Sequence, residues 1–134
     1  MRSLLRVALA ATAAVALCFA APLAAQNASH VVVVKMSDAP GGQFVFQPVA
    51  VVAQRGDTLR FVQESSTPHN VAFRKTAKGS KLGSASTGPY LLTPGQTYDL
   101  VIDSRFTDGD YTFACDPHEG AGMHGSLTVG ASSK

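Results

Sequence analysis

The sequence predicts an all-β fold, an antiparallel sandwich of seven or eight short strands. Short β-branched or aromatic runs recur along the chain, as at residues 31–35, and turn residues separate them, as at 55–57. Tyr98, Leu100 and Ile102 alternate with Asp99, Val101 and Asp103, which is the period of a strand with one buried face. No segment shows a convincing helical pattern. Many short strands with regular turn signals are typical of a β-sandwich.

The first half of the chain contains five candidate strands. They cover residues 31–35, 43–46, 49–54, 58–62 and 70–73. The first is a run of valines that ends in Lys35, and the second precedes Pro48. The third is apolar and leads through a glycine turn into the fourth, and the fifth is short and apolar.

The second half continues the same pattern. Residues 90–92 form a short apolar run before a Thr-Pro-Gly turn, and the alternating strand at 98–103 follows. After the Asp-Gly turn at 108–109, Tyr111, Phe113 and Cys115 are expected on one face of the next strand, and residues 125–129 complete the domain. The segment at 75–88 is rich in Lys, Gly and Ser and is predicted to be a surface loop. We find no repeat and no second domain.

The first 25 residues are typical of a secretory signal peptide. Arg2 and Arg6 make a positive start, residues 7–21 are apolar, and residues 22–25 offer small side chains for cleavage. An uncleaved anchor is the alternative, although the apolar run is short for a membrane span. We expect cleavage near Gln26 and a periplasmic or secreted protein, with a signal of bacterial type.

Cleavage would leave one domain, residues 26–134, with little net charge. Arg2 and Arg6 are two of the 11 basic residues, so nine remain against nine acidic ones. A nearly neutral domain without a basic tract gives no indication of nucleic-acid binding. Cys115 would be unpaired once Cys18 is removed, and an unpaired thiol in an exported protein is accounted for by metal ligation.

A group of potential copper ligands lies near the C-terminus. Cys115, His118 and Met123 have the spacing C-x₂-H-x₄-M, so one loop can present all three, and His69 lies upstream. Taken singly, His69 would be a turn residue, Met123 a core residue and Cys115 an inert buried thiol. One thiolate, two imidazoles and a thioether are together the ligand set of a blue-copper centre. The combination predicts one type 1 copper that cycles between Cu(I) and Cu(II).

Residues 109–129, with the Pro-His-Asn-Val segment at 68–71, resemble plastocyanin and its bacterial small blue-copper relatives. The resemblance extends over residues 26–134 and implies a cupredoxin fold, a Greek-key β-sandwich with one copper at one end. It carries the four ligands over to His69, Cys115, His118 and Met123. It also implies that the residue after the first histidine, Asn70, ties the ligand loops together and donates a backbone hydrogen bond to the cysteine sulfur. A turn residue that caps its own backbone is the alternative for Asn70.

The chain departs from plant plastocyanins in two ways. Ala114 precedes the cysteine where those proteins carry an aromatic residue of a remote electron-exit patch, and their acidic clusters are missing. The segment after the first ligand strand is basic instead, with Arg74, Lys75, Lys78 and Lys81. These residues form either a solvated loop or a steering patch for an acidic partner. Docking of the plant photosystem type is therefore not expected.

The predicted function is one-electron transfer between larger redox proteins by an exported monomer. Its contact surface is predicted at the apolar end around His118, with Pro68, Pro117 and Ala121. A protein that stores or delivers copper is the alternative. A copper enzyme, such as a nitrite reductase or a multicopper oxidase domain, is a third possibility, and the absence of a His-x-His pair among the four histidines argues against it. No small-molecule substrate is expected. Of the other two histidines, His124 is predicted to be exposed and His30 to lie in a frayed N-terminus.

Overall fold

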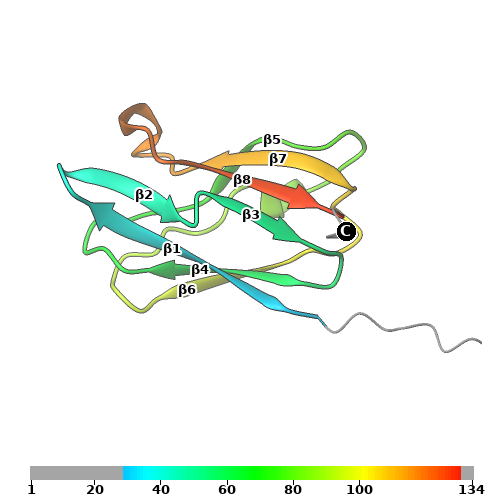
Figure 1. The fold of residues 1–134 in the computed structure, drawn as a ribbon, viewed down its shortest axis with the longest axis horizontal. Coiled ribbons are helices and arrows are strands. Elements are labelled where there is room, and N and C mark those ends of the chain that lie inside the picture. Colours follow the sequence, from blue (N-terminus) through cyan, green and yellow to red (C-terminus); the bar gives the residue numbers. More distant parts are fainter. Residues whose placement is uncertain (1–28, 131–134) are drawn as a thin grey trace, which may run out of the picture.

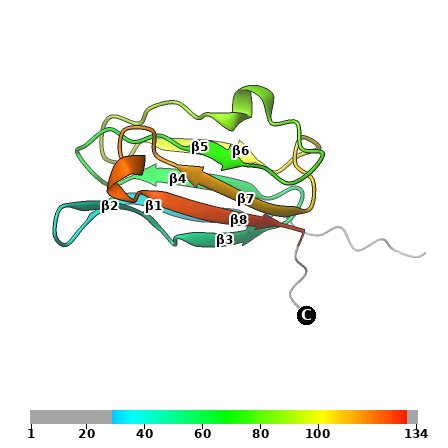
Figure 2. The same cartoon turned by 90° about the horizontal axis from the view of Figure 1, so that it is seen from above.

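Two four-stranded sheets packed face to face make up the domain. The structure, a computed structural model, describes residues 29–130. One sheet has the strand order β2-β1-β4-β6 and the other β3-β8-β7-β5 (Figures 1 and 2). The prediction of an all-β Greek-key sandwich is confirmed. The predicted signal peptide, residues 1–25, lies outside the described residues. Within residues 29–130, no helix has the length and apolar character needed to cross a membrane.

The elements are short and follow the predicted turns. The first sheet contains β1 (Val31–Ala39), β2 (Gln43–Gln47), β4 (Thr58–Gln63) and β6 (Thr97–Val101). The second contains β3 (Ala50–Ala53), β5 (Ala72–Lys75), β7 (Gly109–Ala114) and β8 (His124–Val129). Two short 3-10 helices lie in connections: η1 (Gly83–Ser86) within the predicted surface loop, and η2 (Glu119–Ala121) between β7 and β8.

Two strand pairs are parallel, so the expectation of a purely antiparallel sandwich is wrong. β1 pairs with β4 in the parallel sense, with Val34 opposite Phe61, and β3 pairs with β8, with Val51 opposite Leu127. The chain leaves the first sheet after β2 and enters the second at β3, which allows segments distant in sequence to pair in the same direction. Side-chain alternation has the same period in both orientations, so it carries no information on strand direction.

Two of the predicted strands differ near the ligand segments. Residues 90–92 form no strand, and Leu91 makes only a single antiparallel bridge with His69. The N–H of Leu92 donates to the side chain of Gln96 instead of continuing a ladder. The strand predicted at 70–73 begins two residues later, at Ala72.

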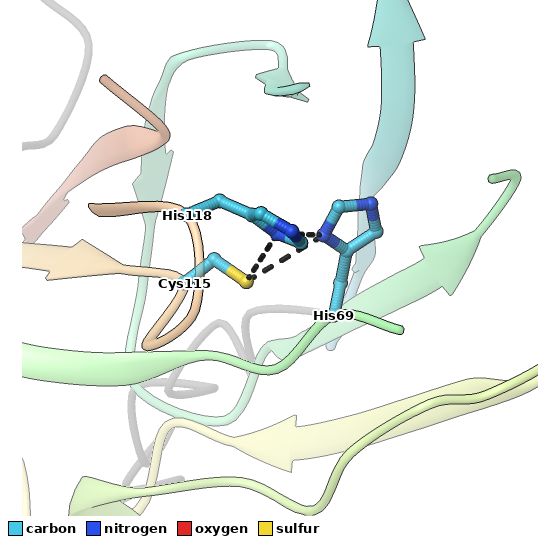
Figure 3. A group of neighbouring side chains, drawn as sticks. All are labelled: His69, Cys115 and His118. Atoms are coloured by element: carbon cyan, nitrogen blue, oxygen red, sulfur yellow. Dashed lines mark hydrogen bonds between the residues drawn. The ribbon is translucent and has the colours of Figure 1, made fainter. Parts of the chain in front are cut away.

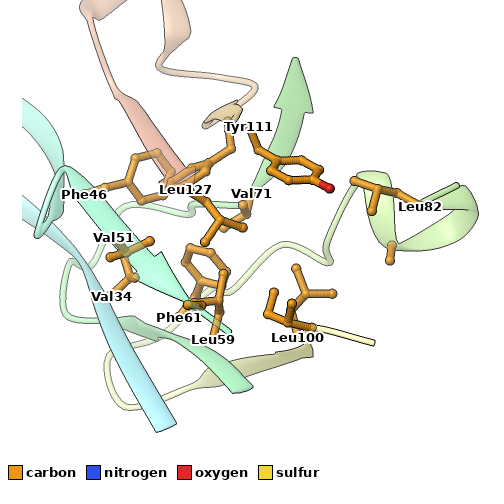
Figure 4. Close-up of a cluster of buried hydrophobic side chains, with 14 of the residues drawn as sticks. Val34, Phe46, Val51, Leu59, Phe61, Val71, Leu82, Leu100, Tyr111 and Leu127 are labelled. Atoms are coloured by element: carbon orange, nitrogen blue, oxygen red, sulfur yellow. The ribbon is translucent and has the colours of Figure 1, made fainter. Parts of the chain in front are cut away.

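Apolar side chains from both sheets fill the space between them (Figure 4). Central members of this core are Val34, Leu59, Phe61, Tyr111 and Leu127. The alternation predicted at 98–103 is confirmed, because Leu100 and Ile102 are buried whereas Asp99 and Val101 are exposed. Burial of such side chains is the main stabilising contribution to a domain of this size.

A buried carboxylate fastens the start of β1 to the turn before β4. Asp57 is 6% exposed, and its two oxygens accept the N–H groups of His30 (2.9 Å) and Gln54 (2.8 Å). Burial alone would raise the pKa of Asp57, but these hydrogen bonds outweigh it and hold the pKa below its ordinary value. His30 is therefore anchored, and the expectation of a frayed chain at this residue is wrong.

Replacing Asp57 with asparagine should lower the free energy of unfolding by about 1 kcal/mol at neutral pH, because an amide has only one accepting oxygen. A carboxylate with a lowered folded-state pKa stabilises the fold above its unfolded pKa, and this contribution is lost as pH falls through the folded-state pKa. The difference from wild type should thus be present at pH 7 and disappear in acid. Urea unfolding of the copper-free protein measures it, with the exposed Asp110→Asn as control. An equal difference at both pH values would contradict the expectation.

Candidate metal centre

Three donor atoms from two parts of the chain meet at one end of the sandwich. Cys115 directly follows β7, His118 lies in the connection to β8, and His69 lies ahead of β5. The Nδ1 atoms of the two histidines are 3.0 Å apart, and Cys115 Sγ lies 3.5 Å from Nδ1 of His69 and 3.4 Å from Nδ1 of His118 (Figure 3). The structure therefore brings together three of the four predicted ligands.

β7 carries Cys115 to this point from the core. Tyr111, Phe113 and Cys115 are all fully buried, which confirms that they share the inward face of the strand and its extension. The rings ahead of the cysteine are packed between the two sheets, so the position of the sulfur is fixed by the core.

The segment that carries His69 is held by paired hydrogen bonds. His69 and Leu91 exchange N–H to C=O bonds of 3.1 and 2.8 Å. Gln63 of β4 is fully buried, and its Nε2 donates to the carbonyls of Thr67 (2.7 Å) and Leu91 (3.0 Å). Gln63 was not among the predicted site residues. Gln63 continues the alternation of the buried residues Leu59 and Phe61 along the strand. This polar residue at a core position was the available signal, because a buried amide needs hydrogen-bond partners.

Three backbone hydrogen bonds close the loop at 115–123. The N–H of Cys115 donates to the carbonyl of Met123 (3.2 Å), the N–H of His118 to that of Cys115 (3.1 Å), and the N–H of Met123 to that of His118 (3.1 Å). Gly122 has a φ of 92° and turns the chain back toward β8 after η2. The chain's own hydrogen bonds thus define the shape of the loop.

Met123 ends this loop with its side chain in the core. The side chain is fully buried, and the main chain is bonded to both Cys115 and His118. The next residue, His124, is exposed, as predicted from the alternation of side chains along an extended segment. Met123 is therefore on the inward side of the loop, and its role as a ligand stays a prediction.

An aromatic ring that the sequence did not indicate packs against both histidines. The ring centroid of Phe44 lies 4.1 Å from that of His118 and 5.3 Å from that of His69. Phe44 belongs to β2, two residues before the core residue Phe46 and therefore on the same face of the strand. That alternation was the available signal, but nothing in it shows which rings Phe44 contacts.

Burial favours the neutral forms of His69 and Cys115. It lowers the pKa of the His69 imidazole, an effect to which His118 adds and which Asp38 opposes. Burial also raises the pKa of the Cys115 thiol, although backbone N–H groups of Asn70 and His118 donate to it and oppose the rise. A neutral imidazole is ready to bind a metal, and a protonated thiol would release its proton on binding one.

Asn70 joins the two ligand segments. Its Oδ1 accepts the N–H of Asp116 (2.9 Å), and its Nδ2 donates to Oδ2 of the same residue (2.6 Å). The tie between the ligand loops that the family resemblance implies is therefore confirmed, and the backbone N–H of Asn70 opposes the rise in the pKa of the Cys115 thiol. The alternative, a residue that caps its own backbone, is not what the structure shows.

Arg74 is not part of a free basic loop. Its Nη2 lies 2.6 Å from Oδ1 of Asp116, and its Nε and Nη2 lie 2.9 and 2.7 Å from Oε2 of Glu119. These contacts with Arg74 hold the pKa of both carboxyls below the usual range. The three lysines that follow are exposed and form no ion pair with another residue of the described range: Lys75, Lys78 and Lys81.

The donor set fits copper. A thiol and two imidazole nitrogens converge on one buried point, and thiolate with imidazole suits copper in both oxidation states. His69 Nε2 is buried without a hydrogen-bond partner among the described residues, so this ring is oriented by packing and by the contacts of its Nδ1. Outer contacts from Asn70 and Phe44 hold the donors in place, as is usual for metal sites.

Comparison with known proteins gives matches to copper proteins. The family model described as copper binding proteins, plastocyanin/azurin family, matches residues 32–130. The chain is 38% identical over 129 residues to chloroplastic plastocyanin of Tetradesmus obliquus, which covers 95% of this chain and 83% of that protein. Oxidized plastocyanin from Dryopteris crassirhizoma has a TM-score of 0.59 at 30% identity, over 73% of this chain and 99% of that one. Pseudoazurin from Methylobacterium extorquens has a TM-score of 0.55 at 31% identity, over 78% of each chain.

Proposed function

Because the chain belongs to the plastocyanin/azurin family of copper-binding proteins, we propose that it is an exported one-electron carrier with a single type 1 copper. Like its plastocyanin relatives, it carries electrons and is not an enzyme. The proposed ligands are His69, Cys115, His118 and Met123. The observation that carries the proposal is the convergence of the His69 imidazole with the thiol and the second imidazole of a hydrogen-bonded loop.

The residues around the site have separate tasks. Copper bound there supplies a couple that gains and loses one electron between Cu(I) and Cu(II). Cys115 gives up its proton to become the thiolate donor, and the N–H of Asn70 orients the sulfur. Phe44 restrains the two imidazoles by ring packing. Because the loop is closed by its own hydrogen bonds, the donors need little rearrangement when the charge at the site changes.

Partner proteins are proposed to dock at the apolar end. Pro68, Pro117 and Ala121 are exposed there, and His118 is partly exposed, which gives a short route from the surface to the donors. Small apolar patches suit transient redox encounters. The carrier is proposed to act as a monomer, and it needs neither nucleic acid nor a small-molecule substrate.

Export is proposed from residues 1–25. The positive start, the apolar run and the small residues before Gln26 form a signal peptide that directs the chain to the periplasm or outside the cell. The family match begins at residue 32, after this segment. Cys115 is the one cysteine of the proposed mature chain, so an oxidising compartment cannot close an intramolecular disulfide.

Replacing Ala121 with aspartate should separate a carrier from a copper-storage protein. Two copies exchanging electrons through this end would each bring a new negative charge to the contact, so self-exchange should slow by about tenfold at low ionic strength. NMR line broadening in mixtures of the reduced and oxidised protein measures the rate. Ser104→Asp is the matched control, because Ser104 is exposed in the loop before β7, at the other end of that strand from Cys115.

A second measurement, of Cu(I) retention, accompanies that of the electron self-exchange rate. A carrier should cycle repeatedly with reductant and oxidant without losing the metal to a modest competing chelator. Ready loss of Cu(I), together with redox behaviour that Ala121→Asp leaves unchanged, would indicate a protein that stores or delivers copper and would overturn the carrier proposal.

Replacing Met123 with leucine should leave the copper-loaded protein blue and raise its reduction potential, on the order of tens of millivolts. The thioether is a weak donor that helps stabilise Cu(II), and leucine keeps water out of the same buried volume. Voltammetry measures the change. Met36→Leu is the control, because Met36 is also fully buried but belongs to β1. Equal potentials in the wild type and Met123→Leu would mean that Met123 only fills the core.

A further inference from the structure

A hydrogen-bonded cluster lies immediately outside the proposed ligands. Three residues each directly follow one of them: Asn70, Asp116 and Glu119. All three belong to this cluster, and Arg74 of β5 supplies its positive charge. The cluster therefore contacts both the loop at 115–123 and the segment that carries the first histidine.

The guanidinium of Arg74 spans both carboxylates of the loop. Nη2 contacts Asp116 at 2.6 Å and Glu119 at 2.7 Å, and Nε contacts Glu119 at 2.9 Å. The second oxygen of Asp116 accepts Nδ2 of Asn70 at 2.6 Å. A planar fork with several donors can hold two acceptors at once, whereas an ammonium is a point charge. The loop is thus attached to β5, which itself pairs with β7.

This arrangement differs from an isolated surface ion pair. The Arg74 side chain is 37% exposed and that of Asp116 is 35% exposed, and a single pair at such exposure contributes little. Here one cation holds two carboxylates that flank His118, and a third residue, Asn70, extends the cluster to the other ligand segment. Loss of the cation would release both carboxylates together and leave them unbalanced beside the donors.

We propose that Arg74 is a positioning residue of the copper site: it holds the loop at 115–123 in its metal-binding shape and balances the charges of Asp116 and Glu119. This inference rests on the proposed function. Two consequences follow. The copper-free loop is kept ordered by Arg74, and removal of Arg74 lowers the reduction potential, because unpaired negative charges favour Cu(II) over Cu(I).

The first measurement is amide hydrogen exchange in the copper-free protein. In Arg74→Gln, exchange at the backbone N–H of Asp116 and Met123 should be at least about tenfold faster than in the wild type. Arg60→Gln is the matched control, because Arg60 makes a similar two-contact pair with Asp99 at 2.7 and 2.6 Å, at 43% and 42% exposure, in the other sheet. The control should leave exchange in the loop unchanged.

The second measurement is the reduction potential of the copper-loaded proteins. The potential should fall in Arg74→Gln and stay at the wild-type value in Arg60→Gln. Arg74→Lys keeps the charge but not the fork, so it should retain the potential while the loop still exchanges faster. This variant also serves if Arg74→Gln does not fold.

The outcomes distinguish this inference from the proposed function. If the wild type forms no blue copper centre, the proposed function fails, and hydrogen exchange still tests whether Arg74 holds the loop. If the wild type is blue but Arg74→Gln matches Arg60→Gln in loop exchange or in potential, the positioning role is overturned and the proposed function stands. Faster loop exchange with a lower potential, absent from the control, supports the inference.

Discussion

Replacing Cys115 with serine is expected to abolish the blue colour of the copper-loaded protein. The colour arises from charge transfer between thiolate and copper, and a hydroxyl is a harder and poorer donor at neutral pH. Cys115 Sγ lies 3.5 and 3.4 Å from the two histidine nitrogens, and Cys115 is the one cysteine among the described residues, so no other thiolate there can take its place. Replacing a residue that only contacts a ligand typically lowers metal affinity about 10–100-fold. Replacing the ligand Cys115 itself should lower copper affinity by more than that.

The absorption spectrum and a Cu(II) titration test this expectation. Thr112→Ser is the control, because it introduces the same residue at an exposed position of β7 and should leave the colour unchanged. Circular dichroism should show the wild-type fold in both variants. An intense visible band that survives in Cys115→Ser would mean that the ligand assignment is wrong.

Replacing Phe113 with alanine is expected to destabilise the copper-free protein by about 3–5 kcal/mol. The side chain is fully buried, and its ring packs edge-to-face against Phe46 and Phe61, with centroids 4.9 and 5.6 Å away. Truncation would remove these contacts and leave a cavity at the centre of the sandwich. A loss of this size is a large part of the total stability of a small domain.

Urea unfolding measures the change in free energy, with Val52→Ala as control. Val52 is 56% exposed on β3, so its truncation should change stability by no more than about 0.5 kcal/mol. A cost below about 1 kcal/mol for Phe113→Ala would mean that the two sheets do not pack around this ring. Because Phe113 lies two residues before Cys115, the same variant should also weaken copper binding.

Much of the fold could be predicted from local patterns. The strand expected at 49–54 is β3 and that at 58–62 is β4, because each is an apolar run that begins just after a turn residue, Pro48 for β3 and Gly56 for β4. Pairing was harder to predict. Leu91 forms one bridge instead of a strand because a nearby side chain takes the next N–H, and the parallel partners of β1 and β3 lie far away in the sequence.

The outer residues of the site could not be predicted in the same way. Phe44, Gln63 and Arg74 lie on three different strands, and each contacts the ligand segments only after the sheets have packed. The sequence placed Arg74 in a basic loop, because it shows the neighbouring lysines but not the distant carboxylates that pair with Arg74 in the structure. Charge pairing over long sequence separations has no local pattern.

The sequence by itself determined the strand periodicity and the chemistry of the donors. Cys115, His118 and Met123 are close together in the chain, so their spacing alone indicates one loop, and ligand type alone indicates copper. Only the tertiary structure decided how His69 meets that loop, which side chains pack on the rings, and how the loop is attached to β5. The physical reason is that contacts between distant segments depend on the packing of the two sheets, which no short stretch of sequence specifies.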